Sequence, residues 1–290
     1  MPMPMPMPMP MPMAMPMPMP SFSIVTVVRN DLEALEQTRA SVLMQEGADY
    51  EHLIIDGESS DGTRAWLESQ PQSDSFRWAS EPDLGIYDAM NKGATLARGS
   101  YLVFMNAGDT YRGVHAMRQQ QDEMRRQGSV WGYSKAIVVD EQHNPVRPPY
   151  GLEVYSPLRH AYARVALCHQ ATIVRRDAFE RLRGFNWEKY GAVADYAFLL
   201  STGRQSAPAV IEGVHVNYLD GGVSAINPDT QILKHRARVG VFEMGAVLTA
   251  ADYVFYVYSE MTAGARRWAK RTVRKVGGQA LITRYAGRGA

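Results

Sequence analysis

The chain has 290 residues, of which 46% are hydrophobic and 21% charged, and its formal net charge is +1. This length allows one large domain with an appendage, and the composition is that of an ordinary soluble globular protein. The small net charge excludes a strong overall field for nucleic acid, and the single cysteine, Cys168, excludes an internal disulfide framework.

The first 20 residues alternate methionine and proline, with Ala14 as the one break. Proline at every second position excludes a helix, and the segment lacks the basic start and continuous apolar stretch of a signal peptide. We therefore predict an extended, disordered tail at residues 1–20.

The next hundred residues alternate between β-branched apolar runs and segments of helical spacing. Helices are predicted between the runs, the first opened by a capping box of Asn30 and Glu33 and the third spanning 86–98. Strands separated by helices imply an α/β domain whose central sheet is mostly parallel and flanked by helices. The predicted strands are 23–28, 52–55, 76–80 and 101–105.

The second half of the chain has a more mixed pattern. Further strands are predicted at 137–139, 171–174 and 210–218, and a helix at 194–202. Beyond Pro228 the pattern is mostly helical to about Val276. We therefore predict one domain over residues 21–227, followed by a helical, basic segment over residues 228–290.

Two acidic residues directly follow predicted strands. Asp56 begins a run of small and acidic residues, and Asp109 ends the turn that starts at Asn106. Ligands of open parallel sheets bind beyond the carboxyl ends of the strands, so both carboxylates should project from the same edge. A nucleotide or a divalent metal would suit them there. Ordinary turns after strands, with Asp61 as a helix cap, are the alternative.

Three segments in succession resemble family 2 glycosyltransferases. They are Asp56–Thr63, Ser80–Gly93 and Asn106–Asp109, and the middle one is the longest and most specific. They are similar, nearly letter for letter, to the bacterial subgroup that builds exopolysaccharide and glycolipid glycans, including colanic-acid-type enzymes. Three later segments extend the resemblance to about residues 22–226, namely Cys168–Ala171, Ala194–Tyr196 and Gly221–Ser224.

The resemblance implies a GT-A fold and an inverting transfer of a sugar from a nucleotide-diphosphate donor to an acceptor hydroxyl. The implied acceptor is a lipid-linked or polysaccharide glycan, in the biosynthesis of cell-surface polysaccharide or glycolipid. At the matching positions, the implied donor-binding residues are Arg29, Asn30, Asp56, Asp83 and Asn91.

The resemblance also implies roles for three residues nearer the reacting atoms. Asp109 would hold Mg²⁺ or Mn²⁺ beside the donor diphosphate, and Asp195 would be the general base. His169 would hydrogen-bond the donor or the acceptor. A lone histidine beside apolar residues is equally typical of a satisfied core residue, so both interpretations of His169 stay open.

The metal motif departs from the family pattern. Many members carry Asp-x-Asp-Asp, whereas this chain has Asn106 and Gly108 in place of the first two acids. One carboxylate binds Mg²⁺ weakly, although donor phosphates can supply further ligands. A catalytically impaired nucleotide-sugar-binding subunit is therefore the alternative function.

A nucleotidyltransferase or an NAD enzyme is disfavoured because the chain has neither of the usual glycine-rich phosphate loops.

Six of the ten residues from Arg266 to Lys275 are basic. This segment is predicted to be either a solvated helix or a peripheral attachment to an anionic membrane. Nucleic acid is not expected as a partner, because no recognised binding module accompanies the charge.

The sequence has no uncharged apolar stretch of about 18 residues, so no transmembrane helix is predicted. We expect a cytoplasmic protein, peripheral on the inner face of the cell membrane if residues 266–275 bind lipid.

Overall fold

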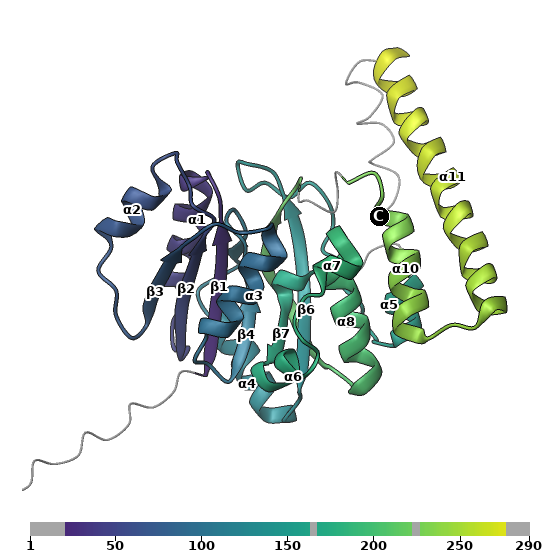
Figure 1. Cartoon of the computed structure of the whole chain (residues 1–290). Helices are drawn as coiled ribbons and strands as arrows, with labels where there is room; N and C mark the ends of the chain where they lie inside the picture. The colour runs from purple at the N-terminus through teal and green to yellow at the C-terminus, as the bar shows by residue number, and fades with distance from the viewer. Residues whose placement is uncertain (1–20, 163–166, 222–226, 277–290) are drawn as a thin grey trace, which may run out of the picture.

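The computed structural model describes residues 21–162, 167–221 and 227–276, with side chains up to residue 262. The predicted tail at 1–20 lies outside the described residues. Within them, eight strands form one sheet with helices on both faces (Figure 1). The strands are β1 (Phe22–Val28), β2 (Tyr50–Asp56), β3 (Phe76–Ser80), β4 (Tyr101–Phe104), β5 (Thr110–Tyr111), β6 (Trp131–Val139), β7 (Thr172–Arg175) and β8 (Ala209–Leu219).

The helices lie between and after these strands, and two single 3-10 turns precede β7 and α8. The helices are α1 (Leu32–Leu43), α2 (Thr63–Ser69), α3 (Ile86–Leu96), α4 (Ala116–Gln127), α5 (Pro157–Tyr162), α6 (Arg176–Arg181), α7 (Trp187–Tyr190), α8 (Ala194–Gln205), α10 (Thr230–Phe242) and α11 (Ala246–Val276), and the turns are η1 (His169–Ala171) and η2 (Gly191–Val193).

The sheet has the strand order β3-β2-β1-β4-β7-β6-β8-β5. The four strands of the first half are parallel, as predicted from their alternation with helices. Strand β7 is antiparallel to both of its neighbours, and β5 is antiparallel to β8. The carboxyl ends of β1, β2, β3 and β4 therefore meet along one edge, where the sequence places its acidic turns.

Both faces of β1 and β4 are buried, which explains why most residues of these two strands are apolar. In β1, Val25 and Val27 face a cluster that includes residues of α3 and α8. Phe22 and Ile24 face the opposite cluster, which includes Met117 of α4. Successive side chains of a strand point to opposite faces, so one seven-residue strand supplies both cores.

A glycine within α3 lets this helix lie close to the sheet. A Cβ atom on Gly93 would stand 2.3 Å from Cγ1 of Val25 and 3.1 Å from Cγ1 of Ile55. The helix predicted over 86–98 therefore forms across Gly93, because packing against β1 and β2 outweighs the low helix propensity of glycine.

The predicted capping box at the start of α1 is wrong. Asp31 is the cap, and its Oδ1 accepts a hydrogen bond of 3.2 Å from the backbone N–H of Ala34. Asn30 instead adopts a left-handed conformation with φ of 53°, and its side chain accepts from the N–H of Ser60. A contact with a loop thirty residues away therefore replaces the capping bond predicted for Asn30, and the neighbouring Asp31 caps the helix.

The two helices after residue 228 confirm the helical pattern predicted there. Helix α10 packs on α8 and η2 through an apolar cluster that includes Leu200, Ala237 and Val241. Helix α11 stands at the edge of the molecule farthest from β3 (Figure 1). Among the described residues, no helix has both the length and the apolar character needed to cross a bilayer.

Candidate active site

The carboxyl ends of β1, β2 and β3 are tied together by backbone hydrogen bonds. The N–H of Gly57 donates to the carbonyl of Val28 over 2.9 Å, and the N–H of Glu81 donates to the carbonyl of Asp56 over 3.0 Å. The three loops that follow these strands consequently form one continuous rim.

Asp56 lies beneath this rim and is fully buried. Its carboxylate accepts a hydrogen bond of 2.6 Å from the hydroxyl of Ser80 and bonds from both the N–H and the hydroxyl of Ser59. Asp56 therefore folds the loop that follows β2, and the groups that face outward belong to that loop and its neighbours.

Three of the expected donor-binding residues surround this loop. The backbone N–H of Asn30 donates to the hydroxyl of Ser59 over 2.7 Å. Arg29 and Asp83 both approach Gly57, where a Cβ atom would stand 2.2 Å from Oδ2 of Asp83 and 3.2 Å from Cδ of Arg29. The structure thus brings Arg29, Asn30 and Asp83 together around a loop in which a side chain at position 57 would displace Asp83.

Asn91 does not join them. Its side-chain amide donates to the carbonyl of Phe185 over 2.9 Å and accepts from the N–H of the same residue over 2.9 Å. Both ends of the amide are occupied, so Asn91 joins α3 to the segment after α6. These two bonds give Asn91 a structural role, and its expected donor contact stays a prediction.

Asp109 follows β4 and is buried. Its Oδ1 accepts a hydrogen bond of 2.9 Å from the N–H of Leu219, and its Oδ2 accepts one of 2.7 Å from the amide of Gln170. Burial raises the pKa of Asp109 to about 6, against the opposing effect of these two hydrogen bonds and of His169.

The turn η1 joins Asp109 to Asp195. Gln170 donates to Asp109, and the preceding residue, His169, has its Nδ1 atom 2.9 Å from Oδ2 of Asp195. The Nε2 atom of His169 lies 3.4 Å from the amide nitrogen of Asn106. A donating amide requires an accepting Nε2, so we assign the ring proton to Nδ1, which donates to the Asp195 carboxylate.

Asp195 lies in the first turn of α8 and accepts two further hydrogen bonds. The hydroxyl of Tyr87 donates to its Oδ1 over 2.9 Å, and the N–H of Tyr196 donates to the same atom over 2.7 Å. Burial acts to raise the pKa of Asp195, but the hydrogen bonds donated by His169, by Tyr87 and by the N–H of Tyr196 outweigh it and lower the pKa. The carboxylate is therefore ionised at neutral pH.

Tyr87 and Gln170 are site residues that the sequence analysis missed as individual positions. Both lie within segments that carried the family resemblance, Ser80–Gly93 and Cys168–Ala171. The family resemblance of these two segments could therefore have indicated both residues. The sequence around Tyr87 does not indicate that this tyrosine contacts Asp195, 108 residues later.

Helix α10 also reaches this region. The Nζ atom of Lys234 lies 5.4 Å from the ring centre of Tyr196. Burial lowers the pKa of Lys234, and the Asp195 carboxylate acts in the opposite direction. A cation from the C-terminal segment therefore stands in the electrostatic environment of Asp195.

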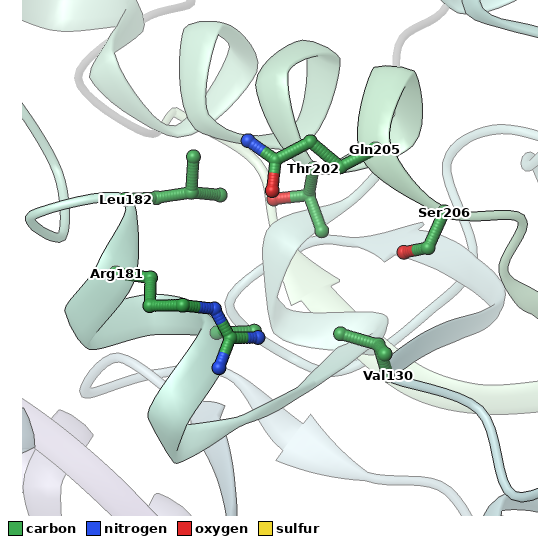
Figure 2. A pocket seen from close by; sticks show the side chains of 7 residues that line it. Val130, Arg181, Leu182, Thr202, Gln205 and Ser206 are labelled. Carbon is green, nitrogen blue, oxygen red and sulfur yellow. The ribbon is translucent and has the colours of Figure 1, made fainter.

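Two small pockets lie elsewhere. Figure 2 shows one between α6 and the end of α8, where Val130, Arg181, Thr202 and Gln205 line it. The other is lined by residues that include Gly184, Tyr190 and Ser201. None of the predicted site residues lines either pocket. Asp56 and Asp109 follow β2 and β4, so we place the candidate site at the carboxyl ends of the parallel strands.

Comparison with known proteins identifies the family. The sequence model described as glycosyl transferase family 2 matches residues 23–183, more than half of the chain. The chain belongs to glycosyl transferase family 2. This confirms the resemblance seen in the sequence and makes the protein a transferase.

Two mycobacterial relatives of this family 2 enzyme are similar over most of its length. An uncharacterised glycosyltransferase of Mycobacterium tuberculosis is 28% identical over 224 residues, which are 75% of this chain and 82% of the relative. A PGL/p-HBAD biosynthesis glycosyltransferase of Mycobacterium bovis is 27% identical over 230 residues, 73% of this chain and 82% of the relative.

Solved structures show that the fold of this glycosyltransferase is of the GT-A type, as expected. TarS of S. aureus, solved in complex with UDP-GlcNAc, superposes with a TM-score of 0.63 and 14% identity, over 82% of this chain and 71% of that one. The mannosyltransferase PcManGT of Pyrobaculum calidifontis, solved with GDP-Man and Mn²⁺, gives a TM-score of 0.55 and 17% identity, over 93% of this chain and 80% of that one.

Proposed function

We propose that this enzyme transfers a sugar from a nucleotide-diphosphate donor to an acceptor hydroxyl, by a single displacement that inverts the anomeric centre. The observation that supports this most is the link between Asp109 and Asp195 through neighbouring residues of η1. Structural neighbours solved with UDP-GlcNAc and with GDP-Man support a nucleotide sugar as the donor class.

The nucleotide end of the donor is proposed to lie over the loop after β2. Arg29 and Asp83 would contact it from either side of Gly57, and Asn30 and Asp56 would hold the loop in shape. In this role Asp56 acts through the loop that it folds, because its own carboxylate is buried and already accepts three hydrogen bonds.

Asp195 is the proposed general base. An ionised carboxylate can accept about four hydrogen bonds, and three are already made by Tyr87, His169 and Tyr196. The remaining lone pair, on Oδ2, would take the proton of the acceptor hydroxyl as the new glycosidic bond forms. His169 and Tyr87 are then positioning residues that hold this carboxylate in one orientation.

A divalent metal, Mg²⁺ or Mn²⁺, is part of the proposal, and the residues present fit it in part. The described residues contain no cluster of three or more acidic, histidine or cysteine ligands. The Oδ1 atom of Asn106, however, is buried without a hydrogen-bond partner, and oxygen is the ligand type that Mg²⁺ and Mn²⁺ prefer. Asn106 and Asp109 would hold the ion together with donor phosphate oxygens. When bound, it would neutralise charge on the leaving nucleoside diphosphate.

A catalytically impaired nucleotide-sugar-binding subunit is the second candidate. The observation that favours it is Asp109, whose two oxygens both accept hydrogen bonds from the protein itself. Donor hydrolysis measured with and without Mn²⁺ separates the candidates. Turnover that depends on Asp195 supports the transferase, whereas donor binding without any turnover supports the subunit.

The acceptor is proposed to be a lipid-linked or polysaccharide glycan, in cell-surface polysaccharide or glycolipid biosynthesis. The relative named for PGL/p-HBAD biosynthesis supports this class. We accordingly propose a cytoplasmic enzyme, peripheral on the inner face of the membrane through residues 266–275. The side chains of this segment lie outside the described residues, so the proposal rests on their sequence.

A panel of UDP-, GDP- and dTDP-sugars, scored by thermal shift with Mn²⁺, tests the donor class. One nucleotide should raise the melting temperature, and its effect should fall when Asp83→Ala is introduced. A panel in which no nucleotide sugar stabilises the protein contradicts the proposed function.

A further inference from the structure

Helix α11 exposes a continuous apolar face. Val247 is 83% exposed, Val254 67%, Tyr258 65% and Met261 69%. The spacings of seven, four and three residues place these side chains on the same side of a helix. Val257 and the small residue Ala250 lie along the same side of the helix and are also exposed. This face therefore has no charged group from Val247 to Met261.

The opposite side of α11 is held by a buried ionic network. The carboxylate of Asp252 accepts two hydrogen bonds from Arg238, of 2.7 and 3.0 Å, one of 2.6 Å from His235 and one of 2.7 Å from Tyr162. Arg238 and His235 belong to α10, so the network joins the two helices. It determines which side of α11 faces the protein, and the apolar face therefore points away from it.

The sequence beyond Met261 indicates what covers this face. Trp268 continues the seven-residue spacing of Val247, Val254 and Met261. The helix extends to Val276, and its last turns include the six basic residues of 266–275. A second copy of the chain, aligned in parallel, would bring six like charges against six others. An anionic lipid surface instead complements the charge and takes up the apolar face.

We propose that α11 lies in the surface of an anionic bilayer, with the face formed by Val247, Val254, Tyr258 and Met261 inserted between the lipid headgroups. Attachment itself does not depend on the reaction. Its use, which is to hold the site beside a lipid-linked acceptor, rests on the proposed function.

Vesicle flotation tests the inserted face. The wild-type protein should float with vesicles of equal parts phosphatidylcholine and phosphatidylglycerol, and not with phosphatidylcholine alone. A triple variant, Val254→Gln, Tyr258→Gln and Met261→Gln, should partition at least about tenfold more weakly, because it loses most of the inserted apolar area. Donor hydrolysis should be unchanged in this variant, so a failure of attachment is distinguishable from a failure of the proposed reaction.

The matched control replaces three equally exposed apolar residues elsewhere, as Leu43→Gln, Met44→Gln and Leu158→Gln. It should float like the wild type. Equal loss in the control, full binding of the α11 variant, or equal binding to uncharged vesicles would overturn the proposal. So would a dimer in solution that the α11 variant dissociates, since a second copy would then occupy the face.

A fluorescent label gives a second measurement. The single cysteine, Cys168, is buried, so a dye can be attached selectively at Val254→Cys. Its emission should shift to the blue on anionic vesicles, and a dye at Leu43→Cys should not shift. The same emission at both positions would overturn insertion of this face.

Discussion

The Nδ1 atom of His169 lies 2.9 Å from Oδ2 of Asp195, and this contact joins the turn before β7 to the first turn of α8. The next residue of the same turn, Gln170, donates to Asp109. Two acids separated by 86 positions are thus held by adjacent side chains, which makes their relative placement sensitive to single substitutions.

Replacing Asp195 by asparagine should remove the base and keep its shape. We expect kcat to fall roughly 10²–10⁴-fold, the usual size of a general-base effect, with donor binding largely retained. Turnover and donor-induced thermal shift, measured on the same preparation, test this. Near-normal turnover would exclude Asp195 as the base.

The variant His169→Ala should lower kcat by up to roughly 10²-fold, because the base is no longer held in place. It should also change the pH profile. The hydrogen bond from His169 lowers the pKa of Asp195, so its loss should raise that pKa and move the acidic limb of kcat to higher pH. Tyr87→Phe removes a different hydrogen bond from the same carboxylate and should shift the limb in the same direction. An unmoved limb in both variants would leave the two residues with only a structural role.

The variant Gly57→Ala should weaken donor binding. The new Cβ atom would stand 2.2 Å from Oδ2 of Asp83, so the Asp83 side chain must move. We expect the KM for the donor to rise about three- to tenfold, which corresponds to the loss of about one hydrogen bond. The control is Gly245→Ala, where a Cβ atom meets nothing within 4 Å, and its KM should equal that of the wild type.

His52 should make the fold sensitive to acid. It is fully buried, with Nε2 2.9 Å from the hydroxyl of Thr26 and Nδ1 3.2 Å from the Arg39 guanidinium. Burial, with the charge of Arg39, lowers the pKa of His52 to about 3. Between pH 6.5 and 3 the unfolded chain binds a proton that the folded chain does not, so this contribution to stability falls as pH falls.

Urea unfolding at pH 7 and pH 5 measures this effect. His52→Gln should lose about 2 kcal/mol less stability than the wild type over this interval. The exposed His115→Gln should follow the wild type. Equal losses in all three proteins would show that His52 is not the group responsible.

The elements of this protein follow largely from local pattern. Strand β3 was predicted with its observed bounds, and β1, β2, β4 and α3 were predicted to within two residues at each end. Helix α4 was missed because its buried face includes Gln120 and Gln121, which have no apolar signal. Gln121 is buried because its amide pairs with the backbone of Asp49, a partner 72 residues away.

The candidate site, too, was predicted from the sequence only in part. The placement of Asp56 and Asp109 at one edge follows from the alternation of strands with helices and the parallel arrangement that this implies, whereas the order of strands in the sheet was not predicted. The periodicity of the sequence does not determine which side chains face outward. Asp56 is buried and Asn91 is occupied by Phe185 because of contacts across long separations. The pairing of His169 with Asp195 likewise arises only when η1 and α8 pack together. The periodicity of a sequence indicates which residues are neighbours within one helix or strand. The contacts of Asp56, Asn91 and His169 instead depend on how separate helices, strands and loops pack together.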